Sequence, residues 1–356
     1  MLERCQGEVT EIIHRRKGMT EVLVKVRGEI ALAVNYDLLT GEVEVGDLVE
    51  LNTGAVTLGL GTGGRHFIMH NAQSRLKNSL PGHIMKLRYT PWQIACLSVE
   101  EESSPYRDKI TGFKSLNQLP VIICSLHSML PLAAAAYSLS APQKRIAYLM
   151  TEGGALPLAF SETAARLKEA GIIVGMVTAG NAFGGDLEAV NNYTGMIAAK
   201  EVLQADCIIA GMGPGIAGTG TKYGFSGLEQ GELINCVNIL GGTPITIPRL
   251  GFFDCRARHY GISHHTLTVL SEIALTHSLV VLPKLAAEKR DFVLNQLELA
   301  GILQKHSVIE KECSLAAYDY LQDLGIKVTT MGRGINEAKE FFQTCFAAGC
   351  LAGERE

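Results

Sequence analysis

The segment from Asp254 to Thr266, which reads Asp-Cys-Arg-Ala-Arg-His-Tyr-Gly-Ile-Ser-His-His-Thr, contains the densest group of reactive side chains in the sequence. Its two guanidinium groups could bind a phosphate or a carboxylate through paired N–H donors. Its imidazoles could transfer protons near neutral pH. The segment lies between an apolar run at 244–250 and a predicted helix at 264–275. A polar loop between strand and helix is a common ligand site in open α/β proteins, so we treat residues 254–265, the His–Arg loop, as the candidate site.

Within this loop His264 and His259 are the predicted acid–base groups, and Asp254 is a further candidate catalytic residue. Arg256 and Arg258 are predicted to bind the anion. The alternative interpretation is that these side chains form a hydrogen-bonded network that locks the loop to the rest of the domain.

Ser263 is the predicted N-cap of the helix that follows, which places His264 and His265 in its first turn. The positive end of the helix dipole lowers imidazole basicity there and favours the neutral form. Consecutive side chains on a helix point about 100° apart. We therefore expect the two adjacent histidines not to share an ion, and no metal site is predicted.

Four glycine-rich loops follow predicted strands, at 152–157, 179–186, 211–221 and 331–334. Glycine allows the backbone to approach a ligand closely, and backbone amides at such turns attract anions. In a doubly wound sheet these loops converge on one edge. We expect them to line a single crevice together with the His–Arg loop and to bind a small anionic ligand, which could be phosphorylated.

Glu152 and Asp186 add candidate catalytic carboxylates to this crevice, although Asp186 could instead cap a helix predicted at 187–203. Lys222 and Tyr223 could contact the ligand or form a solvated lid. The complete set of predicted ligand-binding residues is Arg256, Arg258, His265, Ser263, Gly213, Gly215, Gly218, Thr219, Thr221, Lys222, Tyr223, Asn181, Gly184, Gly185 and Arg333.

Two nucleotide-binding motifs are matched only in part. Residues 213–218 fit G-x-G-x-x-G after a strand, but the next helix is predicted to begin only near Ser226, and Asn238 stands where an acidic residue is expected. Thr221 separates Gly220 from Lys222, which breaks the P-loop spacing. Dinucleotide and P-loop nucleotide binding are therefore disfavoured, and the identity of any cofactor stays open.

The predicted fold class is α/β, with a doubly wound, largely parallel sheet and an N-terminal small β-barrel. Residues 1–75 contain short β-branched runs between turns, and 76–115 form a connecting segment. From 116 to 356, continuous apolar strands alternate with glycine-rich loops and helices, which indicates a sheet covered on both faces. A last strand at 326–331 is expected to return to the same sheet, before a closing helix.

Composition excludes several classes of protein. Hydrophobic residues make up 47% and charged residues 19% of the chain, as in a globular protein, and a net charge of −4 gives no basic field for nucleic acid or a membrane surface. The apolar region 119–141 contains His127 and Pro131 and is predicted to be a buried strand and helix. Nine cysteines without a Cys-x-x-Cys pair, and a start without a signal-peptide pattern, predict a cytoplasmic protein. The sequence leaves open whether the protein forms a homodimer.

Several strings taken together resemble a bacterial family that is known only as a domain of unknown function. The resemblance covers most of the chain and implies a cytoplasmic bacterial protein, but it supplies no activity, substrate or catalytic residue. The strings are residues 181–191, 213–221 with 223–227, 258–265 and 331–334.

Three functions remain open from the sequence. The first is an enzyme that acts on a small anionic metabolite in the crevice, with glycine-loop amides stabilising developing negative charge. The second is a non-catalytic sensor that binds a nucleotide-like ligand at the same site, with the barrel contacting a partner. The third is a metal-dependent hydrolase that uses Asp186, Asp254 and a histidine, although the H-x-H and H-E-x-x-H spacings are missing.

Overall fold

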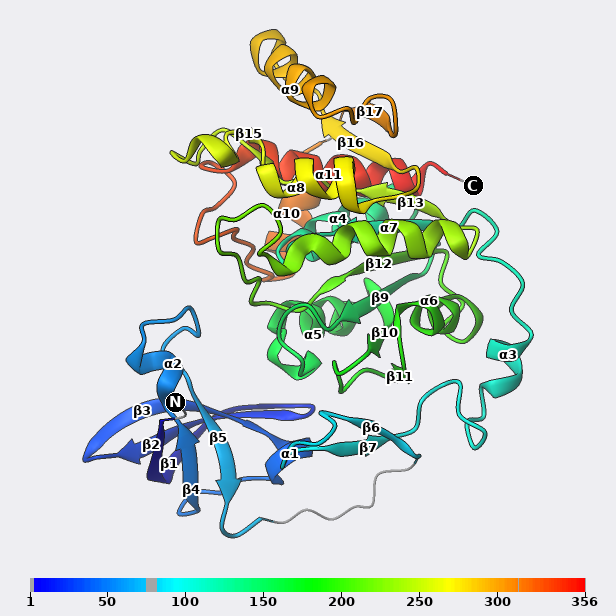
Figure 1. Ribbon diagram of the computed structural model, residues 1–356. Helices are drawn as coiled ribbons and strands as arrows, with labels where there is room; N and C mark the ends of the chain where they lie inside the picture. The colour runs from blue at the N-terminus through cyan, green and yellow to red at the C-terminus, as the bar shows by residue number, and fades with distance from the viewer. Residues whose placement is uncertain (1–2, 75–81, 313, 356) are drawn as a thin grey trace. The chain divides into compact units, whose positions relative to one another are not determined.

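A computed structural model describes residues 3–74, 82–312 and 314–355. The chain divides into two compact units, one up to Leu97 and one from Ser98 onward, which are described separately. Figure 1 shows the barrel of the first unit in blue and the layered α/β structure of the second in cyan to red. No helix in the described part of the chain is long and apolar enough to cross a membrane.

The first unit contains a closed five-stranded barrel with strand order β1-β2-β3-β5-β4. Alternate residues such as Val22, Val24 and Leu51 are fully buried inside it, as the β-branched runs predicted. In the closed barrel each strand pairs with a neighbour on both sides. The elements are β1 (Arg4–Arg16), β2 (Met19–Val26), β3 (Glu29–Tyr36), α1 (Asp37–Thr40), β4 (Leu48–Asn52), α2 (Gly54–Thr57), β5 (His66–Asn71) and a hairpin of β6 (Ile84–Lys86) and β7 (Ile94–Cys96).

The second unit is built on an eight-stranded parallel sheet, which confirms the predicted fold class. Its order is β11-β10-β9-β12-β8-β13-β16-β17. The strands are β8 (Pro120–Cys124), β9 (Ile146–Thr151), β10 (Ile173–Ala179), β11 (Leu187–Ala189), β12 (Cys207–Met212), β13 (Thr243–Thr246), β16 (Leu279–Pro283) and β17 (Ser307–Lys311).

Helices cover both faces of this sheet. Ile122 of β8 packs with the helices on one face, while its neighbours Val121 and Ile123 pack on the other. Figure 1 shows α11 beside α4 on the first face. The first face carries α4 (Met129–Ser140), α5 (Glu162–Glu169), α10 (Ala316–Asp323) and α11 (Lys339–Gly353), and the second carries α3 (Arg107–Thr111), α6 (Asn192–Glu201), α7 (Glu229–Ile239) and α9 (Ala287–Leu299).

Strand order reverses around β8, which is the first strand of this sheet in the sequence and lies near its middle. The chain places β9, β10 and β11 on one side and β13, β16 and β17 on the other, and β12 is inserted between β8 and β9. The chain leaves β8 toward α4 on the first face and leaves β12 toward α7 on the second face, so these two neighbouring loops leave the sheet in opposite directions. Ligands of open α/β proteins bind at such a point.

Two predicted elements are wrong. The helix predicted at 187–203 is instead the edge strand β11 followed by α6, and Asn191, not Asp186, caps that helix by accepting from the amides of Tyr193 and Thr194. Residues 326–331 form no sheet strand, because the place beside β16 is taken by β17. The interrupted apolar region 119–141 does form a strand and a helix, β8 and α4, as predicted.

We predict that Gly349→Ala destabilises the second unit. A Cβ at Gly349 would lie 2.4 Å from the carbonyl oxygen of Ala133 and 2.7 Å from Cβ of Ala136, so α11 and α4 would have to separate. Overpacking of this kind typically costs about 1–3 kcal/mol of unfolding free energy, despite the better helix propensity of alanine. Denaturant melts would measure the loss. Gly334→Ala, where a Cβ meets nothing within 4 Å, is the control, and equal stability of the two variants would contradict this packing.

Candidate functional site

The His–Arg loop follows one short strand and contains a second, at the carboxyl edge of the sheet after β13. These strands, β14 (Leu250–Gly251) and β15 (Gly261–Ile262), pair antiparallel, and a short 3-10 turn lies between them at Ala257–His259. Gln296 of α9 fixes the base of the loop, because its side chain donates to the Tyr260 carbonyl and accepts from the Ile262 amide. The backbone pairing of β14 with β15 and the Gln296 side chain together hold the base of the loop.

The three histidines of the loop come together. Ring centroids of His264 and His265 lie 4.1 Å apart, and His259 lies 5.1 Å from the first and 5.3 Å from the second. One ring nitrogen from each lies within 4.8 Å of the others. Nε2 of His264 and Nε2 of His265 are buried and make no hydrogen bond. The sequence argument that adjacent helical histidines point too far apart to share an ion does not describe this geometry.

Ser263 organises this cluster, as its predicted role as N-cap implies. Its hydroxyl accepts from the amide of His265, which begins the short helix α8 (His264–Thr268), and it lies 2.8 Å from Nδ1 of His259. The helix continues as a π-helical turn at Val269–Ile273, a local irregularity that is frequent at functional sites.

Burial and nearby arginines keep all three imidazoles neutral at pH 7. Burial is the main cause that lowers the pKa of His259 to about 4 and that of His265 to about 3, and it also lowers the pKa of His264. Repulsion from Arg249 lowers all three further. Burial and the arginines thus act in the same direction as the helix dipole, toward the neutral imidazole. Neutral rings can accept a proton or bind a metal ion.

Asp254 is held by arginines and is not placed to act as a base. Its side chain is 5% exposed and accepts two hydrogen bonds from the Arg256 guanidinium, at 2.8 and 2.6 Å. Arg249 lies 3.9 Å away. The hydrogen bonds from Arg256 hold the pKa of Asp254 well below its usual range. Arg256 is thus engaged with Asp254, whereas Arg258 is exposed and has no side-chain hydrogen bond or ion pair within the described residues.

The glycine-rich loop predicted at 211–221 begins after β12 at residue 213 and runs to residue 225, and it lies against this cluster. The ring of Phe225 stacks on His265 with centroids 3.9 Å apart, and the Gly220 position is close to the Arg258 guanidinium. Lys222 and Tyr223 both bind Glu272 in the π-helical turn. Within the loop Gly218 pairs with Phe225, and the hydroxyls of Thr219 and Thr221 bond to each other, so these predicted ligand-binding residues build the loop itself.

The remaining glycine-rich loops bind one another. Glu152 accepts hydrogen bonds from the amide and the side chain of Asn181, and the amide of Ala155 donates to the Pro214 carbonyl between Gly213 and Gly215. The amide of Gly184 donates to the Glu188 carboxylate, and that of Gly185 to the Thr178 hydroxyl. Glu152 and Asn181 thus lie together, as the crevice prediction requires.

The carboxylate of Asp186 binds two other elements of the fold, β10 and α5. It accepts from the Met176 amide in the middle of β10 and binds Lys168 of α5. It therefore attaches the β11 edge to α5.

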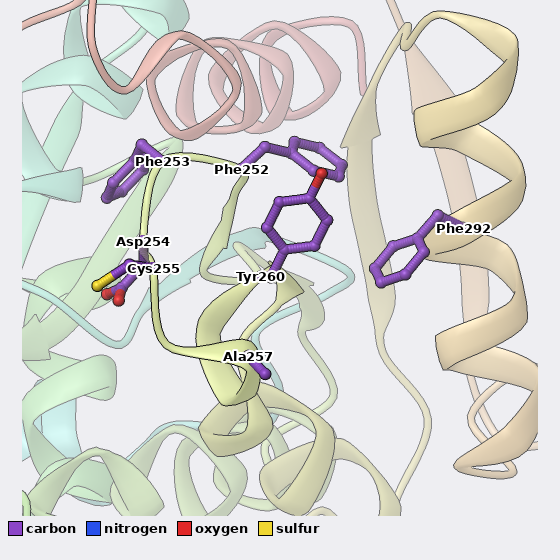
Figure 2. Close-up of a pocket in the computed structure, with 7 residues that line it drawn as sticks. All are labelled: Phe252, Phe253, Asp254, Cys255, Ala257, Tyr260 and Phe292. Carbon is purple, nitrogen blue, oxygen red and sulfur yellow. The ribbon is translucent and has the colours of Figure 1, made fainter.

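An aromatic pocket of about 470 Å³ adjoins the His–Arg loop. Figure 2 shows Tyr260 between Phe252 and Phe292, with Asp254 and Cys255 on the opposite wall. Arg333 of the fourth glycine-rich loop lies over the ring of Phe253, 5.0 Å from its centroid, which brings that loop to the same site. No local motif marks Phe292, because it comes from α9, distant in sequence.

Glu229, at the start of α7, was not among the predicted site residues. Its carboxylate accepts from the Thr151 hydroxyl at 2.6 Å, at the end of β9. Burial raises the pKa of Glu229 to about 7. A carboxyl group that titrates near neutrality at a strand end is a candidate acid–base group, but only the fold makes its burial apparent.

Residues 32–349 match the family model described as Protein of unknown function (DUF3866). Because this match covers most of the chain, the chain belongs to that family, and the resemblance inferred from the sequence strings is confirmed. The comparison with curated proteins found no match.

We predict that Asp254→Asn lowers the free energy of unfolding by about 1–2 kcal/mol at pH 7, because Arg249 and Arg256 lose their anionic partner. The loss is smaller than for a fully buried pair, since the Arg256 side chain is 45% exposed. The native pKa of Asp254 is depressed, so its contribution is present above the unfolded pKa of about 4 and is lost as pH falls toward the native value. Denaturant melts from pH 3 to pH 7 would measure this.

In these melts the difference between wild type and Asp254→Asn should shrink below about pH 4. The control is Asp291→Asn, whose carboxylate is 77% exposed. A constant difference across the pH range would argue against the ionic role of Asp254.

Proposed function

We propose that this DUF3866 protein is an enzyme that acts on a small anionic metabolite, with a divalent metal ion of the zinc class bound by His259, His264 and His265. The observation that carries the proposal is the convergence of three ring nitrogens within 4.8 Å, two of them on rings whose buried Nε2 atoms have no hydrogen-bond partner. Buried polar atoms are normally satisfied, so two such atoms in one cluster need a partner.

The geometry of the cluster suits a tetrahedral ion. Zinc binds imidazole nitrogen at about 2.0–2.1 Å, which places neighbouring nitrogens about 3.3 Å apart. Small inward movements of the rings would reach this arrangement from the present separations. Ser263 holds Nδ1 of His259, which leaves Nε2 of that ring as the ligand atom. A hydrogen bond to the second ring nitrogen is the usual way in which proteins orient a metal-binding histidine.

Three histidines leave a fourth coordination position for water or substrate, as in catalytic zinc sites. A metal ion there would lower the pKa of bound water and polarise a substrate oxygen. Arg258 is the exposed cation of the loop and is our candidate for the anionic group of the substrate. Apolar parts of the substrate would occupy the aromatic pocket around Tyr260 and Phe292. The reaction class that fits is metal-assisted hydrolysis of a small phosphorylated or carboxylated compound.

The donor set differs from the one that the sequence suggested for a hydrolase. Asp254 is neutralised by Arg256, and Asp186 binds Lys168, so neither carboxylate is available as a ligand in this conformation. The positive charge of Arg249 and Arg258 weakens cation binding and strengthens binding of an anion to the ion. Metal and anionic substrate should therefore bind cooperatively.

We expect chelator-stripped protein to bind one Zn²⁺ or Co²⁺, with Co²⁺ giving the visible absorption of a tetrahedral site. His264→Ala and His265→Ala should each weaken metal affinity at least tenfold, because each removes one of three ligands. The control is His277→Ala, whose ring lies 2.8 Å from the Ser307 hydroxyl, away from the cluster. Isothermal titration and absorption spectra would measure the binding. Unchanged affinity in both variants, or no binding by wild type, would refute the metal site.

Arg258→Ala should lower kcat/KM at least tenfold for the best substrate found among small phosphate and carboxylate esters, while metal stoichiometry stays at the wild-type value. Stability should change little, because the Arg258 side chain is exposed. Arg355→Ala, at another exposed arginine, controls for the change in net charge. Stabilisation by ligands without any turnover by the metal-loaded protein would favour a sensor over an enzyme.

A further inference from the structure

A second pocket, of about 290 Å³, opens at the reversal of strand order. Its polar lining residues are His127, Ser128, Thr163, Lys327, Thr329 and Thr330, and we call it the hydroxyl pocket. We infer that the hydroxyl pocket binds a small anionic ligand that carries a phosphate or carboxylate group. This inference is independent of the metal site, because none of the three clustered histidines lines this pocket.

Four segments that are distant in sequence build the pocket. His127 and Ser128 follow β8, Thr163 lies in the first turn of α5, and Lys327 to Met331 follow α10. Pro214 to Ile216 come from the glycine-rich loop after β12. The segment that was expected to form the last sheet strand thus forms a pocket wall instead.

The charge of the lining selects the class of ligand. Among the described residues that line the pocket, Lys327 is the one charged residue and none is a carboxylate. Within the described residues the side chains of Lys327, Thr163 and Thr329 make no hydrogen bond or ion pair. One ammonium group and several hydroxyl donors without a carboxylate match the needs of a phosphate or carboxylate, and lysine is a common point-charge partner for phosphate.

The imidazole and part of the hydroxyl lining are held in place. His127 Nε2 lies 2.7 Å from the Ser161 hydroxyl, and its Nδ1 lies 3.5 Å from the Tyr148 hydroxyl. Tyr148 is buried and donates to the carbonyls of Gly211 and Met212 at the end of β12. Ser128 donates to Thr330 at 3.4 Å. These contacts fix the wall of the pocket, and the side chains of Lys327, Thr163 and Thr329 remain as donors for a ligand.

Gly215 explains why the glycine-rich loop can form one wall. Its φ is +99°, a backbone conformation that other residues rarely adopt, and an added Cβ would meet only the Ala155 amide nitrogen, at 4.0 Å. Backbone conformation, not a lack of space, requires glycine here. Of the glycine-rich loops that were expected to bind an anion, this one therefore contributes Gly215 to the pocket wall.

The test is isothermal titration of the full chain with inorganic phosphate and, separately, with malonate, in the presence of chelator. We expect Lys327→Gln to weaken binding of the tighter probe at least tenfold and Thr329→Val to weaken it severalfold. Lys327→Arg, which keeps the charge, should retain most of the affinity. Lys339→Gln, at an exposed lysine of α11, is the matched control. The probe that binds more tightly distinguishes a phosphorylated from a carboxylated ligand.

Arg258→Ala separates this pocket from the His–Arg loop, because phosphate bound in the hydroxyl pocket should keep its affinity in that variant. Loss of binding in Arg258→Ala together with unchanged binding in Lys327→Gln would overturn the inference, as would absence of binding of both probes to wild type. Thermal melts of each variant verify folding, and the Lys327→Arg result decides the case if Lys327→Gln is unstable.

Discussion

Burial of both faces of the eight-stranded sheet determines where polar chemistry can occur in the second unit. Strand residues such as Ile122, Ile209 and Val280 have no exposed surface, so a charge placed along a strand would be desolvated without compensation. In the central strands polar groups are therefore confined mainly to the strand ends, whereas the edge strand β17 carries the exposed residues Ser307 and Glu310. At the carboxyl edge the reversal around β8 separates neighbouring loops, and both the His–Arg loop and the hydroxyl pocket lie there.

The same desolvation acts on the histidine cluster. Burial drives the imidazoles toward the neutral state, and the surrounding guanidinium groups act in the same direction. Asp254 offsets part of this positive charge, because it is ionised and nearly buried beside Arg256 and Arg249. The neutral imidazoles of the cluster can therefore bind a cation, whereas the guanidinium groups around them favour an anion. An anionic group bound next to a metal ion satisfies both requirements at once.

Features set by local sequence were predictable, and features set by tertiary packing were not. Ser263 caps α8 as expected, because the capping interaction involves residues only two positions apart. The strand at 187–189 was missed, because pairing with β10 overrides a helical pattern in so short a segment. The segment around Lys327 carries apolar residues at Ile326 and Val328, which fill the core below α10 as a strand would. Its exclusion from the sheet depends on β17, which is not adjacent in sequence.

The same contrast between local sequence and tertiary packing applies to the candidate sites. The His–Arg loop is contiguous, so residue types alone identified it, whereas the approach of the three ring nitrogens depends on the turn at Ala257–His259 and on the rotamers. The hydroxyl pocket draws its residues from four segments and has no local pattern at all.

Both sites nevertheless contact one element, the glycine-rich loop after β12. Ile216 lines the hydroxyl pocket and also a narrow space beside Arg249 and His265, while Phe225 of the same loop stacks on His265. Internal hydrogen bonds make the tip of this loop one structural unit, and its ion pair to Glu272 is exposed and therefore weak. Because residues of this one loop contact both sites, a movement of the loop at the hydroxyl pocket would alter the packing of Phe225 on His265.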